Sequence, residues 1–418
     1  MNGVDVPTKE YSVLNEYTCE ILKLQRMRKN RLEMQKMGNE KIYLSAPHMS
    51  GDEITYVKEA FDTNWVAPLG PNVEAFESET AKYVGVNGSL ALSSGSAALH
   101  LAGYLLGVKR GTRVFCSSLT FAATVGAFFH EGVECVFIDS EPESWNMSPD
   151  ALLHAFKNAD KEGCMPSAVI IVNLYGQACD MDSISKICAS YGVPIIEDAA
   201  ESLGASYKGK QTGSFGKYSI LSYNGNKIIT TSGGGMLLSD DLEGIAKAKF
   251  LSTQARDKAR WYEHSTLGYN YRMSNVLAGI GRGQMLHLEE RISARRKVFD
   301  NYVKAFFDIE EFNFMPEPAW SHSNRWLTTL YIDESSDITP IYIIEELEKL
   351  NIESRPVWKP MHLQPVFSGC SYWQHDENND VSAFLFKRGI CLPSGSNLTE
   401  SQQERVINGV RAAMKRNS

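Results

Sequence analysis

The sequence predicts an α/β fold in which a large layered sheet is followed by a smaller α+β region. With 418 residues, 43% of them hydrophobic and 22% charged, the chain has enough apolar material for a large core in two domains. From about residue 87 to 240, short β-rich runs alternate with helical stretches, which is typical of α/β sheets. Shorter strand and helix patterns follow a long charged helix expected at about 276–306.

Residues 1–40 differ from the rest and predict a helical extension. Hydrophobic residues recur there at helical spacing beside a basic run: Leu14, Tyr17, Ile21 and Leu24, with Lys23, Arg26, Arg28, Lys29 and Arg31. One helix with a solvated basic face accounts for this pattern. A helix that binds a partner or a membrane surface is the alternative.

Seven β-rich runs predict the strands of a large domain, which we assign to residues 41–290. They are Ser89–Ser93, Arg113–Ser117, Val133–Asp139, Ala168–Tyr175, Val193–Asp198, Tyr218–Tyr223 and Gly235–Ser239. Helices between them have clear start signals, such as Ser148 as a cap before Pro149. In open α/β sheets ligands bind beyond the carboxyl ends of the strands, so functional residues are expected directly after these runs.

Residues 291–418 predict a smaller C-terminal domain. A strand at Leu327–Ile332 precedes a helix at Pro340–Leu350, which begins after a Thr339 cap, and a last helix begins near Glu400.

Composition and charge disfavour several classes of protein. A net charge of −8 argues against a surface that neutralises many phosphates, so we expect no nucleic-acid partner. No run approaches the ~20 apolar residues of a membrane span, and the N-terminus, with Asp5 and Glu10, lacks the shape of a signal peptide. The eight cysteines form no CxxC pair, so we expect reduced thiols, no metal site and a cytoplasmic location.

The first candidate site is a turn of small residues between a strand and a helix, at Leu92-Ser93-Ser94-Gly95-Ser96-Ala97-Ala98-Leu99. Free backbone N–H groups and the helix dipole would hold a phosphate there, and Ser96 would add a hydroxyl. A tight turn without a ligand is the alternative.

The second is a buried apolar strand that ends in carboxylates, at Val193-Pro194-Ile195-Ile196-Glu197-Asp198-Ala199-Ala200-Glu201. Burying a carboxylate without a partner is costly, so Asp198 is expected to meet a cation. A protonated pyridine nitrogen is one such cation, and a salt bridge to Lys or Arg is the other.

The third is Lys227, which follows the run Tyr218–Tyr223 and precedes Gly233, Gly234 and Gly235. A lysine in such uncharged surroundings is easier to deprotonate and becomes a usable Schiff-base amine. A surface lysine on a loop is the alternative for any single lysine.

One further motif is misleading. Gly204-Ala205-Ser206-Tyr207-Lys208-Gly209-Lys210-Gln211 matches the spacing of a P-loop, but Gln211 stands where a magnesium-binding hydroxyl is required. We therefore predict a polar hairpin at Tyr207–Gln211 rather than a nucleotide-hydrolase site.

The order of phosphate turn, aspartate and lysine is the order found in pyridoxal phosphate (PLP) enzymes of the aspartate-aminotransferase fold. From about residue 42 to the end, the chain resembles the DegT-type sugar-nucleotide aminotransferase family. The matching segments are Asn64-Trp65-Val66-Ala67-Pro68-Leu69-Gly70, Ser94-Gly95-Ser96-Ala97-Ala98-Leu99-His100, Thr120-Phe121-Ala122-Ala123-Thr124, Leu174-Tyr175-Gly176-Gln177, Glu197-Asp198-Ala199-Ala200-Glu201, Gly268-Tyr269-Asn270-Tyr271-Arg272-Met273-Ser274 and Arg355-Pro356-Val357-Trp358-Lys359-Pro360-Met361-His362.

The resemblance implies a fold type I PLP-dependent transferase with a mostly parallel, mixed, seven-stranded sheet and pyridoxal 5'-phosphate as cofactor. Lys227 would be the covalent anchor and proton shuttle, and Asp198 would pair with the pyridinium nitrogen. The other implied cofactor contacts are Phe121 on the ring face, Glu201 near the phenolic oxygen, and Gly95, Ser96 and Ser222 on the phosphate. Asn270 from a neighbouring subunit would complete the phosphate site, which implies a homodimer with shared active sites.

Two positions depart from the common family pattern, because many relatives have His at Asn173 and Gln at Glu201. The segments Ser222–Lys227 and Trp358–Pro365 are similar to the subgroup acting on UDP-4-keto-6-deoxy-N-acetylglucosamine. That resemblance implies L-glutamate as amino donor and a UDP-linked 4-amino sugar for surface polysaccharide or glycan biosynthesis as product. The candidates for the sugar pocket are Trp65, Trp358 and His362, for which core packing and a satisfied surface histidine are the alternatives.

Two other functions remain open at this point. A GDP-perosamine-type or dTDP-sugar aminotransferase would share every PLP residue. A regulatory protein that keeps the fold without catalysis is the other, although such a role gives no reason to retain Lys227.

Overall fold

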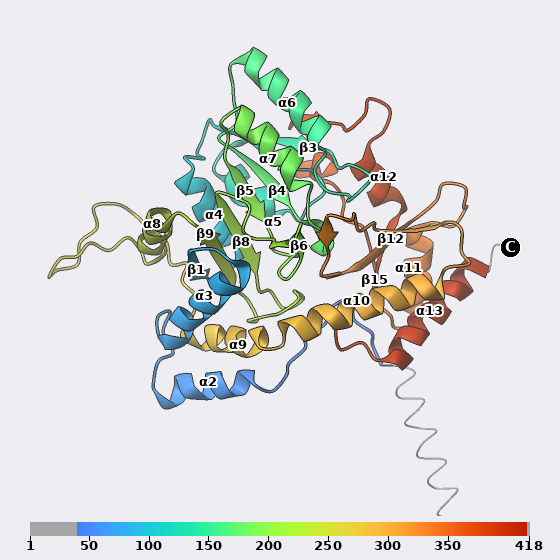
Figure 1. The fold of residues 1–418 in the computed structure, drawn as a ribbon, viewed down its shortest axis with the longest axis horizontal. Coiled ribbons are helices and arrows are strands. Elements are labelled where there is room, and N and C mark those ends of the chain that lie inside the picture. Colours follow the sequence, from blue (N-terminus) through green and yellow to red (C-terminus); the bar gives the residue numbers. More distant parts are fainter. Residues whose placement is uncertain (1–39, 416–418) are drawn as a thin grey trace, which may run out of the picture.

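A computed structural model describes residues 40–415, and this part of the chain is built around one large twisted sheet (Figure 1). In the described residues the sheet has eight strands in the order β1-β9-β8-β5-β4-β2-β3-β14. Their bounds are β1 Gly88–Leu92, β9 Gly235–Ser239, β8 Tyr218–Ser222, β5 Ile195–Asp198, β4 Ala168–Val172, β2 Arg113–Ser117, β3 Glu134–Ile138 and β14 Tyr372–Trp373. Only β9 runs antiparallel to its neighbours among these strands, so the sheet is mixed and mostly parallel.

All seven strands expected from the sequence are present, and the fold class is confirmed. The structure adds β14, which comes from a distant part of the chain and pairs in parallel with β3. The run expected to continue to Tyr175 ends at Val172 and is followed by a short 3-10 turn, Leu174–Gly176. That turn becomes part of the site described below.

Helices cover both faces of the sheet. Alternate residues along each strand point to opposite faces, so each face packs against its own layer of helices. On β4, Ala168 and Ile170 pack with α4 (Gly95–Leu105) and α5 (Ala123–His130). Val169 and Ile171 pack on the other face with α6 (Pro149–Glu162) and α7 (Met181–Ser190). The strand is fully buried between these layers, as expected for parallel sheets.

The other described helices flank the sheet or lie C-terminal to it. They are α2 Glu53–Asp62, α3 Pro71–Val84, α8 Leu242–Ser252, α9 Asn275–Met285, α10 Leu288–Ala305, α11 Pro340–Lys349, α12 Val381–Arg388 and α13 Glu400–Lys415. The single helix expected at about 276–306 is therefore two helices, α9 and α10. Nothing in the sequence marks the break, because Leu286 and His287 are both compatible with a helix. In the structure the His287 imidazole lies 2.7 Å from the Asp52 carboxylate, a contact between distant segments at the position of the break.

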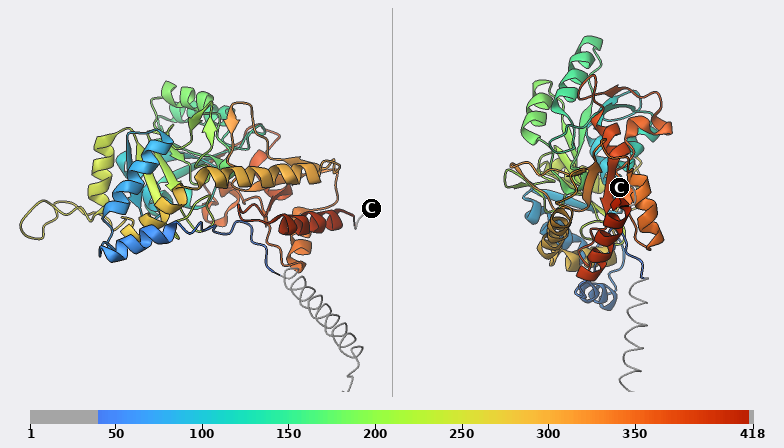
Figure 2. Two further views of the ribbon diagram at one scale, coloured as in Figure 1. Left: turned by 60° about the horizontal axis from the view of Figure 1, so that its bottom comes forward. Right: turned by 90° about the vertical axis from the view of Figure 1, so that its right-hand side faces the viewer.

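The C-terminal part forms a second, antiparallel sheet in the order β10-β12-β15-β13. Its strands are β10 Phe312–Phe314, β12 Thr328–Ile332, β15 Gly389–Leu392 and β13 Arg355–Pro356. Helices α10, α11 and α13 share a hydrophobic core with this sheet, at one end of the molecule (Figure 2). The Thr339 cap of α11 is confirmed by its hydroxyl, which accepts from the Tyr342 N–H. The domain boundary near residue 290 stays a prediction, and the helix expected in residues 1–39 lies outside the described residues.

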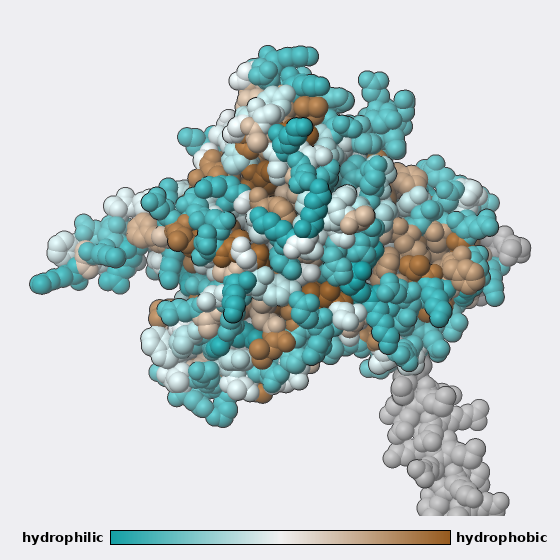
Figure 3. Space-filling view, in the orientation of Figure 1, coloured by the Kyte–Doolittle hydropathy of each residue, from teal (hydrophilic) through white to brown (hydrophobic). Residues whose placement is uncertain are grey.

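Two further segments lie outside these two sheets. The expected hairpin is formed by β6 (Ser206–Tyr207) and β7 (Lys210–Gln211), and β6 also pairs with β11 (Ser321–His322). The segment between α8 and α9 reaches far from the body in both figures, and Thr253 pairs with Asn270 at its base (Figures 1 and 2). On the face seen in Figure 3, hydrophilic residues dominate and hydrophobic ones form small separate areas. Among residues 40–415, no helix combines the length and apolar character that a bilayer crossing demands.

Candidate active site

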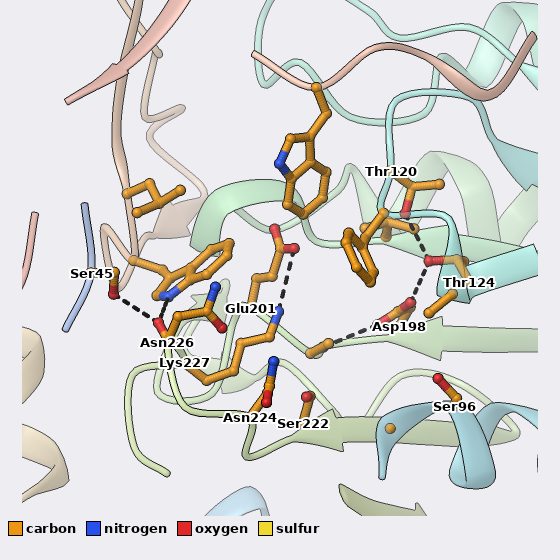
Figure 4. Close-up of a pocket in the computed structure, with 18 of the residues that line it drawn as sticks. Ser45, Ser96, Thr120, Thr124, Asp198, Glu201, Ser222, Asn224, Asn226 and Lys227 are labelled. Atoms are coloured by element: carbon orange, nitrogen blue, oxygen red, sulfur yellow. Dashed lines mark hydrogen bonds and ion pairs between the residues drawn. The ribbon is translucent and has the colours of Figure 1, made fainter. Parts of the chain in front are cut away.

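A cavity of about 640 Å³ lies at the carboxyl ends of β1, β2, β4, β5 and β8. This is the place that an open α/β sheet offers to a ligand. Eight of the residues singled out from the sequence line it: Gly95, Ser96, Phe121, Asp198, Glu201, Ser222, Lys227 and Trp358. Figure 4 shows that Lys227, from the loop after β8, approaches the same space as Asp198 and Glu201, from the end of β5 and the turn that follows it.

The turn before α4 has the geometry of an anion site. The Ser94 hydroxyl accepts from the Ala97 N–H at 3.1 Å and caps the helix. The other N–H groups of the first turn have no intrahelical partner, as at the start of any helix. Strand β9 passes directly beneath, since a Cβ on Gly235 would lie 2.4 Å from the Ser94 carbonyl carbon. A Cβ on Gly95 would meet the Ser222 side chain at 3.2 Å. Small residues therefore keep this turn open toward the cavity.

Asp198 ends β5 with its carboxylate almost fully buried. Its Oδ2 accepts from the Thr124 hydroxyl at 2.8 Å and its Oδ1 from the Ala200 N–H at 3.1 Å. Burial raises the pKa of Asp198, because these neutral donors do not replace the lost hydration. A cation arriving in the cavity would relieve that cost.

Glu201 lies on the other side of the cavity and is 5% exposed. Its Oε2 accepts from the Tyr175 N–H at 2.7 Å, and its Oε1 lies 3.6 Å from Lys227 Nζ. Burial raises the pKa of Glu201 to about 7, although Lys227 opposes that rise. The carboxyl group is thus poised to change its charge near neutral pH.

Tyr175 is held in a left-handed backbone conformation (φ 51°, ψ 20°), which is uncommon for a buried aromatic residue. This conformation directs its N–H at Glu201, and its hydroxyl accepts from the Trp358 N–H at 3.0 Å. The next residue, Gly176, has φ 94°, and a Cβ there would lie 1.8 Å from Asn324 Oδ1. The turn after β4 therefore links two walls of the cavity.

Lys227 lies in a loop after β8, and its side chain is 11% exposed. Its N–H donates to the Asn224 carbonyl at 3.0 Å, and the loop closes through Thr231 N–H to the Tyr223 carbonyl at 3.0 Å. The amine lies 4.4 Å from the centre of the Trp326 ring. Lys227 is therefore an almost buried amine between a carboxylate and an aromatic face, not the surface lysine of the alternative.

Phe121 and Trp358 form the aromatic wall, with ring centroids 5.6 Å apart. Phe121 remains 60% exposed, so one side of its ring faces open space next to the cavity. A flat ring has room to stack there.

Three residues singled out from the sequence lie elsewhere in this single chain. Trp65 is 45% exposed and Asn270 is exposed at the base of the projecting segment, so neither lines the cavity. His362 is also outside it. Its Nδ1 pairs with the Ser118 hydroxyl at 2.7 Å, and its Nε2 lies 3.2 Å from Asp380. These contacts place His362 outside the cavity of this chain, and its role in a sugar pocket stays a prediction.

Sequence reasoning missed several residues of the site, namely Ser45, Thr124, Tyr175, Asn226 and Trp326. Thr124, Tyr175 and Asn226 were part of quoted segments but received no role. Ser45 and Trp326 reach the site through long-range contacts that no local pattern reveals.

Comparison with known proteins places the chain in a family. The model of the DegT/DnrJ/EryC1/StrS aminotransferase family matches residues 47–411. The chain belongs to this family. It is 55% identical over 369 residues to EpsN of Bacillus subtilis, which is named as a pyridoxal phosphate-dependent aminotransferase, covering 88% of this chain and 95% of that protein.

Other relatives in the family carry substrate names. A GDP-perosamine synthase of Caulobacter vibrioides is 35% identical, covering 88% of this chain and 96% of that protein. A UDP-4-amino-4,6-dideoxy-N-acetyl-beta-L-altrosamine transaminase of Campylobacter jejuni is 34% identical, covering 62% of this chain and 68% of that protein. Among solved structures, a DegT-family aminotransferase from Brucella abortus superposes with a TM-score of 0.80 at 27% identity, covering 87% of this chain and 96% of that one.

The protein is thus a PLP-dependent sugar aminotransferase, and the cofactor expected from the sequence is confirmed. The geometry fits that cofactor. A buried carboxylate without a cationic partner, Asp198, suits a pyridinium nitrogen, and the open turn at Gly95 suits a phosphate.

Proposed function

We propose that this protein transfers the amino group of L-glutamate to C4 of a nucleotide-linked 4-keto-6-deoxy sugar, with Lys227 as the anchor of the cofactor. The observation that carries the proposal is the placement of Lys227 Nζ in one cavity with two buried carboxylates, one 3.6 Å away on Glu201 and the other on Asp198. An amine, a partner for a pyridinium and an aromatic wall are the groups that PLP chemistry needs.

Each residue has a distinct task in this proposal. PLP, when bound, supplies an electron sink that eases proton removal next to the transferred amino group. Lys227 holds the cofactor through its amine and, once released, is the base placed to move a proton at C4 of the sugar. Asp198 keeps a positive charge on the ring nitrogen, and Thr124 fixes the orientation of that carboxylate. Phe121 and Trp358 form the aromatic wall that would shield one side of the cofactor ring from water.

The phosphate is assigned to Gly95, Ser96 and Ser222 at the start of α4. We propose that Asn270 completes this site in a partner subunit, so that a homodimer has two shared active sites. The support is the position of Asn270, which is exposed at the base of the projecting segment and outside the cavity of its own chain.

For the sugar nucleotide we propose UDP-4-keto-6-deoxy-N-acetylglucosamine, whose 4-amino product would enter surface polysaccharide or glycan biosynthesis. Similarity of Ser222–Lys227 and Trp358–Pro365 to enzymes of that substrate supports this choice, as does the partial match to the Campylobacter transaminase. A GDP-4-keto-6-deoxy sugar is the second candidate, because the GDP-perosamine synthase matches nearly the whole chain.

The test compares three nucleotide-linked keto sugars directly. Purified protein with PLP and glutamate is given UDP-, GDP- and dTDP-linked 4-keto-6-deoxy sugars, 2-oxoglutarate release is followed, and the products are identified by mass and NMR. Efficient turnover of the UDP substrate supports the proposal, and preference for the GDP substrate replaces it with the second candidate. A protein that binds PLP but turns over no keto sugar would revive the non-catalytic role.

The anchor is tested separately. Borohydride reduction of the PLP-loaded protein followed by peptide mass spectrometry is expected to place the adduct on Lys227, and Lys227→Ala is expected to abolish turnover while the fold survives. An adduct on another lysine would contradict the assignment.

A further inference from the structure

The carbonyl oxygen of Asn226, directly before Lys227, accepts two hydrogen bonds from distant parts of the chain. The Trp326 indole N–H donates at 2.7 Å and the Ser45 hydroxyl at 2.7 Å (Figure 4). Both acceptor positions of this carbonyl are therefore filled. The peptide that carries Lys227 is fixed from the segment before β12 and from the N-terminal segment at once.

Trp326 also contacts the amine itself. Its ring centre lies 4.4 Å from Lys227 Nζ, within the range of a cation–π contact, and its side chain is 2% exposed. Tyr175 and Trp358 surround the indole, each with its ring centroid 6.3 Å away. A residue packed this tightly presents one fixed orientation to the lysine.

A buried arginine supports both donors. Arg295, on α10, is 1% exposed, and its guanidinium donates to the Trp326 carbonyl at 2.5 Å, the Ser394 carbonyl at 3.0 Å and the Ser45 hydroxyl at 3.0 Å. These three partners in the described part of the chain are neutral oxygens, not carboxylates. A buried cation with neutral partners is costly, so its contribution is to geometry rather than to stability.

We propose that Trp326 is a positioning residue for Lys227. Its indole N–H holds the Asn226 carbonyl, its ring face lies against the Lys227 amine and would stabilise the ammonium that forms when this base takes up a proton, and Arg295 and Ser45 support this arrangement. A fixed position beside Glu201 would hold the Lys227 amine in the same place in every turnover, whether or not it is joined to the cofactor. The inference rests on the proposed role of Lys227 as cofactor anchor.

The first test measures the position of Lys227 in cofactor-free protein. Trp326→Phe keeps an aromatic face and removes the N–H, while Ser45→Ala removes the second donor to the same carbonyl. Each variant is labelled with a limiting amount of an acylating reagent, and peptide mass spectrometry compares Lys227 with the exposed Lys297 as internal standard. We expect Lys227 to react about fivefold faster in either variant, the factor expected for one lost hydrogen bond.

A matched control is Trp320→Phe. Trp320 packs on Tyr207 near the small hairpin, with ring centroids 5.1 Å apart, and does not line the cavity. In the Trp320→Phe protein, the reagent should label Lys227 at the wild-type rate. Unchanged labelling in both Trp326→Phe and Ser45→Ala would overturn the proposal.

The second test asks whether Trp326 acts through Lys227. In the wild-type background, Trp326→Phe is expected to lower kcat about fivefold with little change in KM. In Lys227→Ala protein rescued by a small primary amine, the same substitution should have no further effect, because the side chain that it positions is gone. An equal loss in both backgrounds would show a merely structural role. If the proposed role of Lys227 as cofactor anchor is wrong, borohydride will trap PLP on another lysine. The labelling experiment is done without the cofactor, so its result does not depend on that outcome.

Discussion

Replacement of Glu201 by glutamine changes the pH dependence of stability in a direction that the structure fixes. In the cofactor-free protein, burial raises the pKa of Glu201 from its ordinary value of 4.5 to about 7. The folded state therefore binds the proton more tightly than the unfolded state, and the contribution of Glu201 to stability is lost as pH rises through this window. At about 1.36 kcal/mol per pH unit, the loss amounts to about 3 kcal/mol.

The amide introduced by Glu201→Gln cannot titrate, so the variant protein is expected to gain about 3 kcal/mol on the wild type between pH 4.5 and pH 8. The amide oxygen can still accept from the Tyr175 N–H, which preserves the local contact. The assay is denaturant unfolding of both cofactor-free proteins at matched ionic strength, with the exposed Glu400→Gln as control for the same chemical change. A difference that does not vary with pH would refute the reasoning, because it would mean that the nearby Lys227 offsets the effect of burial on the pKa of Glu201.

Three further outcomes follow from the site. Asp198→Asn keeps the acceptor for Thr124 but removes the charge opposite the ring nitrogen, so turnover should fall by ~10²- to 10³-fold. The variant should also bind PLP more weakly, so that its PLP absorbance disappears after less dilution than in the wild type. A near-normal kcat would exclude the pairing. Trp358→Ala should raise KM for the keto sugar several-fold and leave the glutamate half-reaction nearly unchanged, and an equal effect on both would assign the residue to the cofactor. Mixed dimers of Lys227→Ala and Asn270→Ala chains should regain about a quarter to a half of wild-type activity if each site is shared, whereas no recovery would contradict the shared site.

The strands could be predicted from the sequence because each parallel strand is a continuous apolar run ending in small or polar residues. Their order in the sheet could not, because it depends on contacts between segments far apart in the chain. Strand β14 shows the limit, since two residues, Tyr372 and Trp373, are too few to show a period and become a strand only by pairing with β3. The break between α9 and α10 left no trace for a similar reason.

The chemical groups of the site were visible because each follows a predicted strand, as Asp198 follows β5. Their support was not. Trp326 is 100 residues from the carbonyl that it holds, and the left-handed backbone of Tyr175 has no signature in the letters around it. His362 lies inside a matching motif, yet Ser118 and Asp380 hold it outside the cavity, a position that the motif alone does not reveal.

The three carboxylates of one short segment show what distinguishes chemistry from structure. Glu197 is fully buried and accepts from five neutral donors, at Asn173, Gly213, Phe215, Gly216 and Ser219. Asp198 points to the opposite face of the strand and has two donors, while Glu201 has one donor and an amine. A carboxylate accepts about four hydrogen bonds, so Glu197 has no capacity left for a ligand, whereas the other two do. Asn173, which departs from the histidine of many relatives, is one of the donors that complete Glu197. Asn173 does not line the cavity, so its contribution is to the support of the strand.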